Sequence, residues 1–224
     1  MSQTRNAPTI PASRPVPARS PLRFLLAGGV AAGPLFLGAG LLQGLTREGF
    51  DFGRNALSQL SLGSLGWIQI GVFLATGALL IGGAVGARHA LRGAPGGIWA
   101  PRLIGVFGVS FLVAGVFTAD PGAGFPVGTP ETTTPVVSGH GAVHMVAGMV
   151  GYLALCAAFL ILARYFSARQ ARGWALACRL APVAVIAGFA ASAASVAAFT
   201  AGAAIGLLWL SAALVRLSGL SRRP

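Results

Sequence analysis

The sequence contains no lysine and only four acidic residues, Glu48, Asp51, Asp120 and Glu131, in 224 positions. All sixteen basic residues are arginine, and charged residues make up 9% of the chain, against about 25% in a typical soluble domain. Apolar residues account for 55% of the chain, and its mean hydropathy is +0.77. A composition this poor in charge excludes an ordinary soluble domain and indicates a membrane protein.

Several other absences exclude classes of function. Two cysteines, Cys156 and Cys178, are too few for a disulfide framework. Without lysine there is no G-x-x-x-x-G-K-[ST] phosphate loop, and no G-x-S-x-G nucleophile elbow occurs. The net charge of +12 does not indicate binding to nucleic acid, because the arginines are scattered at the ends of apolar segments.

Five long uncharged stretches separate the charged residues. A helix needs about 20 apolar residues to cross the ~30 Å hydrocarbon layer. The last stretch, 180–215, would form a single helix of ~54 Å, which is too long for one crossing. We therefore divide it into two helices with a tight turn around 195–200, and predict an all-α, polytopic membrane bundle of six transmembrane helices. The other four stretches are 24–45, 65–87, 103–119 and 139–163.

The distribution of charge predicts how these helices cross the membrane. Fourteen arginines lie in the N-terminal tail, the second and fourth gaps and the C-terminal tail, whereas all four acids lie in the first and third gaps with Arg47 and Arg54. Since cytoplasmic loops carry the excess of arginine, both termini are predicted to be cytoplasmic. The chain then comprises a disordered tail (1–21), a transmembrane domain (22–218) and a C-terminal tail (219–224) in the cell membrane, in contact with the lipid bilayer.

The unusual residues of the chain gather on the predicted outer side. The first and third gaps are rich in glycine, proline and polar residues, and such backbone near a membrane is tolerated where it is buried in protein or lines a wet cavity. Both gaps emerge on the same side, so they can pack on each other. We predict an outward-facing polar pocket built from Arg54, Asn55, Ser58, Gln69, Asp120, His140 and His144.

A metal site is one interpretation of this group. His140 and His144 are four residues apart and share one helical face, the spacing at which two imidazoles bind zinc in zincins. Asp120 or Glu131 would supply a third ligand, so that His140, His144 and Asp120 form a candidate zinc site. The histidines equally fit proton transfer or hydrogen bonding at a helix start, and Asp120 fits a helix end paired with Arg54.

Three stretches of these loops resemble a known family. They are 57–63 followed by 66–69, then 114–121 with 124–126 and Gly128, and finally His140-Gly141 with His144. In order and spacing they are similar to a family of bacterial multi-pass membrane proteins, domain of unknown function 998, over residues 24–217. This chain has Asn55-Ala56 where relatives often have His-Pro, and Gly139 where they have an aromatic residue. The resemblance implies about six membrane helices and no established activity.

Three functions remain open from the sequence. The pocket would bind a small molecule, a lipid headgroup or a protein partner without catalysis. Alternatively, a metal-dependent membrane hydrolase would use His140, His144 and Asp120 as ligands and a bound water as the nucleophile. A transporter is the third possibility, although the apolar segments offer few ionisable side chains to line a path.

Cysteine labelling tests the predicted topology. In a chain whose native cysteines are replaced by serine, Thr132→Cys should react with a membrane-impermeant maleimide on intact cells, because the third gap faces outward. Arg222→Cys should react only after the membrane is permeabilised, since six crossings return the chain to the cytoplasm. Reaction of both cysteines from the same side would rule out the six-helix topology.

Overall fold

The computed structural model describes residues 21–131 and 137–220, and over these residues the fold is helical. Six of its helices are long and apolar enough to cross a membrane, which confirms the predicted all-α membrane architecture. They are α1 (Pro21–Thr46), α2 (Gly66–Ala90), α3 (Trp99–Val116), α4 (Gly139–Ala168), α5 (Arg172–Ala190) and α6 (Val196–Leu220), and a short 3₁₀ helix, η1 (Leu57–Ser61), lies between α1 and α2. The predicted tails lie outside the described residues except for 21 and 219–220, which belong to α1 and α6.

The last apolar block folds as the predicted helical pair. Its turn occupies residues 191–195, slightly before the position expected from the sequence. Ser192 N donates to Phe189 O at 3.1 Å, and the Ser195 hydroxyl accepts from Ala198 N at 3.1 Å. Serine is a preferred helix N-cap because its oxygen satisfies an amide that has no partner within the helix. Ser195 therefore determines where α6 begins.

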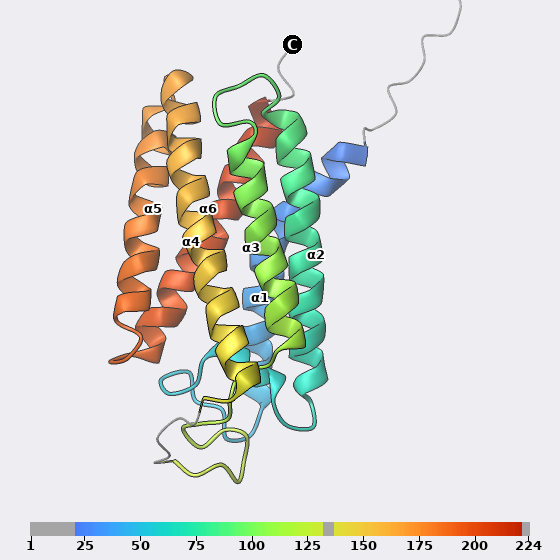
Figure 1. The fold of residues 1–224 in the computed structure, drawn as a ribbon, viewed down its shortest axis with the longest axis vertical. Helices are drawn as coiled ribbons and strands as arrows, with labels where there is room; N and C mark the ends of the chain where they lie inside the picture. The colour runs from blue at the N-terminus through green and yellow to red at the C-terminus, as the bar shows by residue number, and fades with distance from the viewer. Residues whose placement is uncertain (1–20, 132–136, 221–224) are drawn as a thin grey trace, which may run out of the picture.

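The six helices form a closed ring in chain order, because each helix packs on the next and α6 packs on α1. The α1–α2, α3–α4 and α5–α6 connections lie at one end of the bundle, and the α2–α3 and α4–α5 connections lie at the other (Figure 1). We call the first the acidic end, because its loops carry all four acidic residues. We call the second the arginine end. It carries Arg23, Arg88, Arg92, Arg102, Arg164, Arg169, Arg172, Arg179 and Arg216.

Aromatic rings fill the centre of the ring of helices. Phe36 of α1 meets Phe73 of α2 and Phe111 of α3 edge to face, with ring centroids 5.0 and 5.1 Å apart. Phe107 then links Phe111 to Tyr152 of α4, at 5.2 and 5.1 Å. Such edge-to-face pairs add to the packing of large apolar surfaces. The cluster joins α1, α2, α3 and α4 in the middle of the bundle, and the polar loops lie at the two ends.

Glycine allows several of these helices to approach closely. A Cβ atom at Gly83 of α2 would lie 2.7 Å from the Cα of Gly29 in α1, and one at Gly188 of α5 would lie 2.9 Å from the Cα of Gly202 in α6. Backbones in such contact leave no room for a side chain. Gly29 and Gly202 belong to small-xxx-small patterns in the sequence, and both occupy helix contacts.

Replacing one of these glycines should destabilise the bundle. Gly83→Ala forces α1 and α2 apart and is expected to cost about 1–3 kcal/mol, the usual range for overpacking. Gly148→Ala is the matched control, because a Cβ there meets nothing within 4 Å. It should be neutral or stabilising, since alanine favours the helix by about 1 kcal/mol over glycine. The measurement is thermal unfolding in detergent, followed by tryptophan fluorescence. Equal midpoints for the two variants would show that the contact between Gly83 and Gly29 does not limit the packing of α1 on α2.

Candidate functional site

The two long loops at the acidic end are hydrogen-bonded to each other. Asn55 is 1% exposed, and its Oδ1 accepts from Asp51 N at 2.9 Å. Its Nδ2 donates to Gly122 O and Ala123 O at 3.2 and 3.3 Å. Gln59 Nε2 adds a bond to Asp120 O at 3.3 Å. The expectation that these loops pack together is therefore correct, and their polar groups are used in holding that packing.

Arg47, which directly follows α1, also holds the α1–α2 connection in place. Its guanidinium donates to Leu60 O at 3.0 Å and to Leu62 O at 2.5 Å, and its Cζ lies 5.4 Å from the centroid of the buried Phe125 ring. Partial burial lowers the pKa of Arg47 from its usual value, because desolvation disfavours the charged form. The sequence analysis did not single out Arg47, although it is one of only two arginines in the acidic loops.

The carboxylate of Asp120 caps the start of α4. Its Oδ2 accepts from Ser138 N at 3.0 Å, and its Oδ1 accepts from Ser138 Oγ at 2.5 Å. Ser138 Oγ in turn accepts from Gly141 N at 3.0 Å. A Cβ at Gly141 would collide with Asp120 Oδ2. A negative charge is favourable at this end because it faces the positive end of the helix dipole.

His144 performs the complementary task at the end of α3. It is 9% exposed, and its Nδ1 lies 2.8 Å from Phe117 O and 3.1 Å from Ala114 O. Two carbonyl partners require Nδ1 to carry the proton and donate. The ring also meets Phe73 edge to face, with centroids 5.8 Å apart. His144 therefore satisfies carbonyl groups that the end of α3 leaves without helical partners.

The remaining predicted site residues do not converge on one pocket. Arg54 pairs with Asp51 at 3.1 Å and with Glu131 at 3.6 Å, rather than with Asp120 as one interpretation expected. Ser58 contributes its backbone carbonyl, which accepts from the Ser61 hydroxyl at 2.7 Å. Arg54 and Ser58 therefore interact with residues of their own loop or of the neighbouring loop.

Gln69 lies inside the bundle, below the loops. It is fully buried, and its Oε1 accepts from Gln43 Nε2 at 2.6 Å, which joins α2 to α1. Within the described residues, Gln43 Oε1 and Gln69 Nε2 have no hydrogen-bond partner. The pair is therefore an internal contact between two helices and lies apart from the polar surface of the loops.

The histidines and Asp120 do not form a metal centre in the described part of the chain. No three His, Cys, Asp or Glu side chains group there in a way that could hold a metal. Asp120 is bonded to Ser138, His144 is bonded to α3, and His140 is exposed with its ring 5.2 Å from Phe117. This donor set does not fit a tetrahedral zinc ion, whose ligands must converge at about 2 Å.

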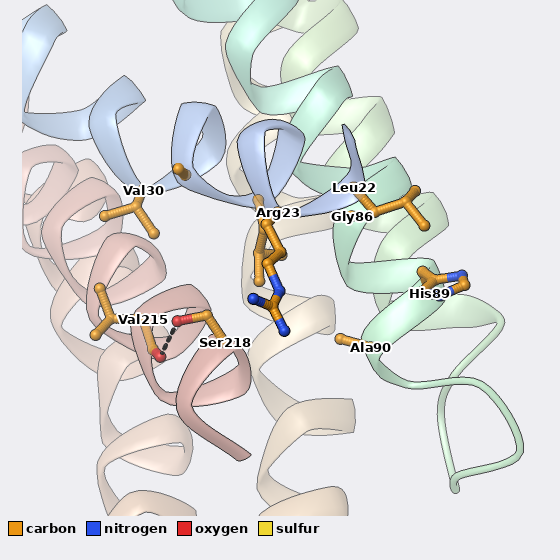
Figure 2. A pocket seen from close by; sticks show the side chains of 10 residues that line it. Leu22, Arg23, Val30, Gly86, His89, Ala90, Val215 and Ser218 are labelled. Atoms are coloured by element: carbon orange, nitrogen blue, oxygen red, sulfur yellow. Dashed lines mark hydrogen bonds between the residues drawn. The ribbon is translucent and has the colours of Figure 1, made fainter. Parts of the chain in front are cut away.

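A cavity of about 550 Å³ lies at the opposite end, between the start of α1 and the ends of α2 and α6. Arg23 of α1 extends into the space between α2 and α6, with His89 and Ser218 also on its lining (Figure 2). Leu26 and Val30 form apolar walls. Gly86 is also part of the lining, and a Cβ there would lie 2.9 Å from Leu26 N of α1.

Comparison with known proteins gives a family and no function. No curated protein and no solved structure matches the chain. The family model described as protein of unknown function, DUF998, matches residues 30–216. The chain belongs to the DUF998 family. In this DUF998 protein the matched segment includes both acidic loops and the His89 side of the cavity, whereas Arg23 precedes it.

The sequence analysis of this DUF998 protein missed the cavity. It named neither His89 nor Arg23 among the candidate site residues. Both side chains are exposed. The only signal was that several helices carry a basic residue near the same predicted end. Sequence alone does not show which of these ends meet around a common space.

Removing the charge of Asp120 should weaken the start of α4. Asp120→Asn keeps the side-chain shape but loses the charge-assisted bonds to Ser138, and we expect a loss of about 1 kcal/mol in unfolding free energy. Glu131→Gln is the control, because its side chain is 71% exposed and its pairing with Arg54 is long. Chemical denaturation in detergent should separate the two variants, and an equal loss would show that Asp120 is not a helix cap.

Proposed function

We propose that this DUF998 protein is a multi-pass protein of the cell membrane, with both termini in the cytoplasm, that binds an anionic amphiphile of the inner leaflet. The binding site is the cavity between α1, α2 and α6. The excess of arginine at that end supports the orientation, because positively charged ends remain on the cytoplasmic side. The single observation that carries the proposal is the Arg23 side chain at an otherwise largely apolar cavity.

The lining of the cavity matches the two parts of an amphiphile. Arg23 offers guanidinium donors to an anionic head, and His89 and Ser218 also belong to the lining, with the Ser218 hydroxyl donating to Val215 O at 2.7 Å. Leu26 and Val30 supply an apolar wall for a hydrocarbon chain. A volume of about 550 Å³ lies within the range of small-molecule sites. Basic pockets between helices on the cytoplasmic side are suited to lipid headgroups.

The charge around the cavity also favours an anion. All four acidic side chains lie at the acidic end, so no aspartate or glutamate of this chain lies beside Arg23. Both ion pairs of the described residues involve Arg54 at that opposite end. Arg23 is exposed, and at the cytoplasmic side of a membrane the headgroups of anionic lipids are attracted to such basic residues.

Access from the membrane supports a lipid rather than a soluble anion. Ala27 of α1 and Val215 of α6 line the cavity and are also exposed, with Val215 at 52%. Both belong to membrane-spanning helices, so their exposed surfaces face lipid. An amphiphile would enter sideways between α1 and α6, with its chain in hydrocarbon and its head at Arg23. No catalytic step is proposed, because the polar groups at the acidic end are bonded to one another.

Two substitutions test this site with dodecyl phosphate as the probe. Ala90→Phe fills the cavity and Arg23→Gln removes the charge, so each should weaken binding about tenfold or more, as expected for losing a contact to a charged group. The controls are Ala75→Phe, on an exposed part of α2 outside the cavity, and Arg92→Gln, an exposed arginine at the same end. Calorimetric titration in phosphatidylcholine nanodiscs should leave both controls within about twofold of the parent protein.

Two further titrants identify which part of the amphiphile is recognised. Inorganic phosphate lacks the chain and dodecanol lacks the charge, so each should bind more weakly than dodecyl phosphate. Equal binding of dodecyl phosphate to the parent protein and to Ala90→Phe would overturn the proposal. Equal binding of dodecanol and dodecyl phosphate would show that Arg23 does not select an anion.

A further inference from the structure

Arg216 lies on the side of α6 that faces α5, one residue after Val215 of the cavity lining. Its Cζ is 6.0 Å from the centroid of the Trp174 ring. Trp174 stacks on Trp209 of α6 with centroids 5.2 Å apart and an interplanar angle of 30°. Trp209 Nε1 is fixed in turn by a 3.3 Å contact with Cys178 Sγ. The guanidinium is therefore positioned by a stack of two rings spanning α5 and α6.

The burial of Arg216 distinguishes it from the other arginines. Within residues 21–131 and 137–220, every arginine is exposed except Arg47 and Arg216. Arg47 donates to two backbone carbonyls, which compensates for its partial burial. In the same described residues, Arg216 Nε is buried with no hydrogen-bond partner. Arg216 is half-buried, and its buried Nε has no acceptor within the described part of the chain, which favours an anion supplied from outside.

The start of α5 adds a second positive feature at this place. Its first amide groups have no partners within the helix, and the N-cap residue, Ala171, provides no side-chain acceptor. Trp174, which carries Arg216 on its ring, is the third residue of this helix, and Arg172 is the first. At the start of α4, by contrast, the Ser138 hydroxyl accepts from Gly141 N, and the negative charge of Asp120 faces the positive end of the helix dipole. No acidic side chain lies at the arginine end to do the same for α5.

We propose that a phosphate group binds between Arg216 and the first turn of α5, carried by an anionic lipid headgroup or free in solution. A guanidinium presents paired N–H donors to phosphate oxygens, and free amides at a helix start favour the same charge. Stacking on Trp174 reduces the entropy lost when Arg216 binds. The site lies across α6 from the cavity and does not rest on the amphiphile proposed there.

Native mass spectrometry of the full chain in a neutral detergent, titrated with phosphatidylglycerol, tests this site. Arg216→Gln should weaken the binding of phosphatidylglycerol about tenfold, since a charged hydrogen-bonded contact is lost. Arg164→Gln, an exposed arginine at the same end, should change it by less than about twofold. Ala90→Phe fills the cavity beside Arg23 and should leave the affinity for phosphatidylglycerol at Arg216 unchanged. This variant therefore separates the two proposals.

Two further arms make the outcome decisive. Arg216→Lys retains the charge but lacks the planar fork, so it should bind several-fold more weakly than the parent protein, and it replaces the glutamine variant if that variant does not fold. Inorganic phosphate that displaces phosphatidylglycerol from the parent protein, and not from Arg216→Gln, would assign the site to free phosphate. Equal affinities for the parent, Arg216→Lys and Arg164→Gln proteins would overturn the proposal.

Discussion

The paired capping of α3 and α4 is the constraint on which the acidic end depends. A membrane offers no water to the backbone groups at a helix end, so the chain must satisfy them itself. Asp120, next to the end of α3, holds Ser138 at the start of α4, while His144 of α4 donates to the last carbonyls of α3. Each helix therefore closes the end of the other, and the described residues on either side, 117–131 and 137–138, are held close to both helices.

These two sets of contacts also position the rest of the acidic end. Because the α3–α4 loop is held at both ends, its carbonyls at residues 120–123 are in place to accept from Asn55 and Gln59. These bonds hold the α1–α2 loop against the α3–α4 loop, and Arg47 donates to two carbonyls of the α1–α2 loop. Polar side chains that looked like a binding pocket in the sequence are thus largely bonded to each other. Such polar side chains are needed to hydrogen-bond the free amides and carbonyls at helix ends, so their presence does not by itself indicate a ligand.

The arginine end has the opposite balance of hydrogen-bonding groups. Arg23, Arg216 and the first amides of α5 are donors, and no acidic side chain lies near them. The two ends therefore differ in physical character, since one is closed by its own acceptors and the other is left with donors and positive charge. This difference places the proposed ligands at the arginine end. Helix α6 borders both proposed sites, with the Arg23 cavity on its α1 side and the stacked Arg216 guanidinium on its α5 side.

The sequence indicated which polar residues gather at the acidic end but not how they are arranged. Asn55, Asp120 and His144 were predicted to line a pocket, and the structure places them at the junction of the acidic loops, bonded within the chain. Their partners were not predictable, because a hydrogen bond joins residues that lie far apart in the chain, such as Asn55 and Gly122. Gln69 illustrates the same point, since its polarity suggested a pocket and its helix position buried it against Gln43 instead.

The sequence by itself determined the number of helices, their approximate limits and the separation of acids from arginines. These features depend on local quantities, namely the length of apolar runs and the charges between them. Only the tertiary structure decided that α6 closes on α1, that Gly83 meets Gly29, and that Arg23 reaches a cavity shared with α2 and α6. Such contacts depend on how helices distant in the chain cross, which is set by side-chain packing along their whole length.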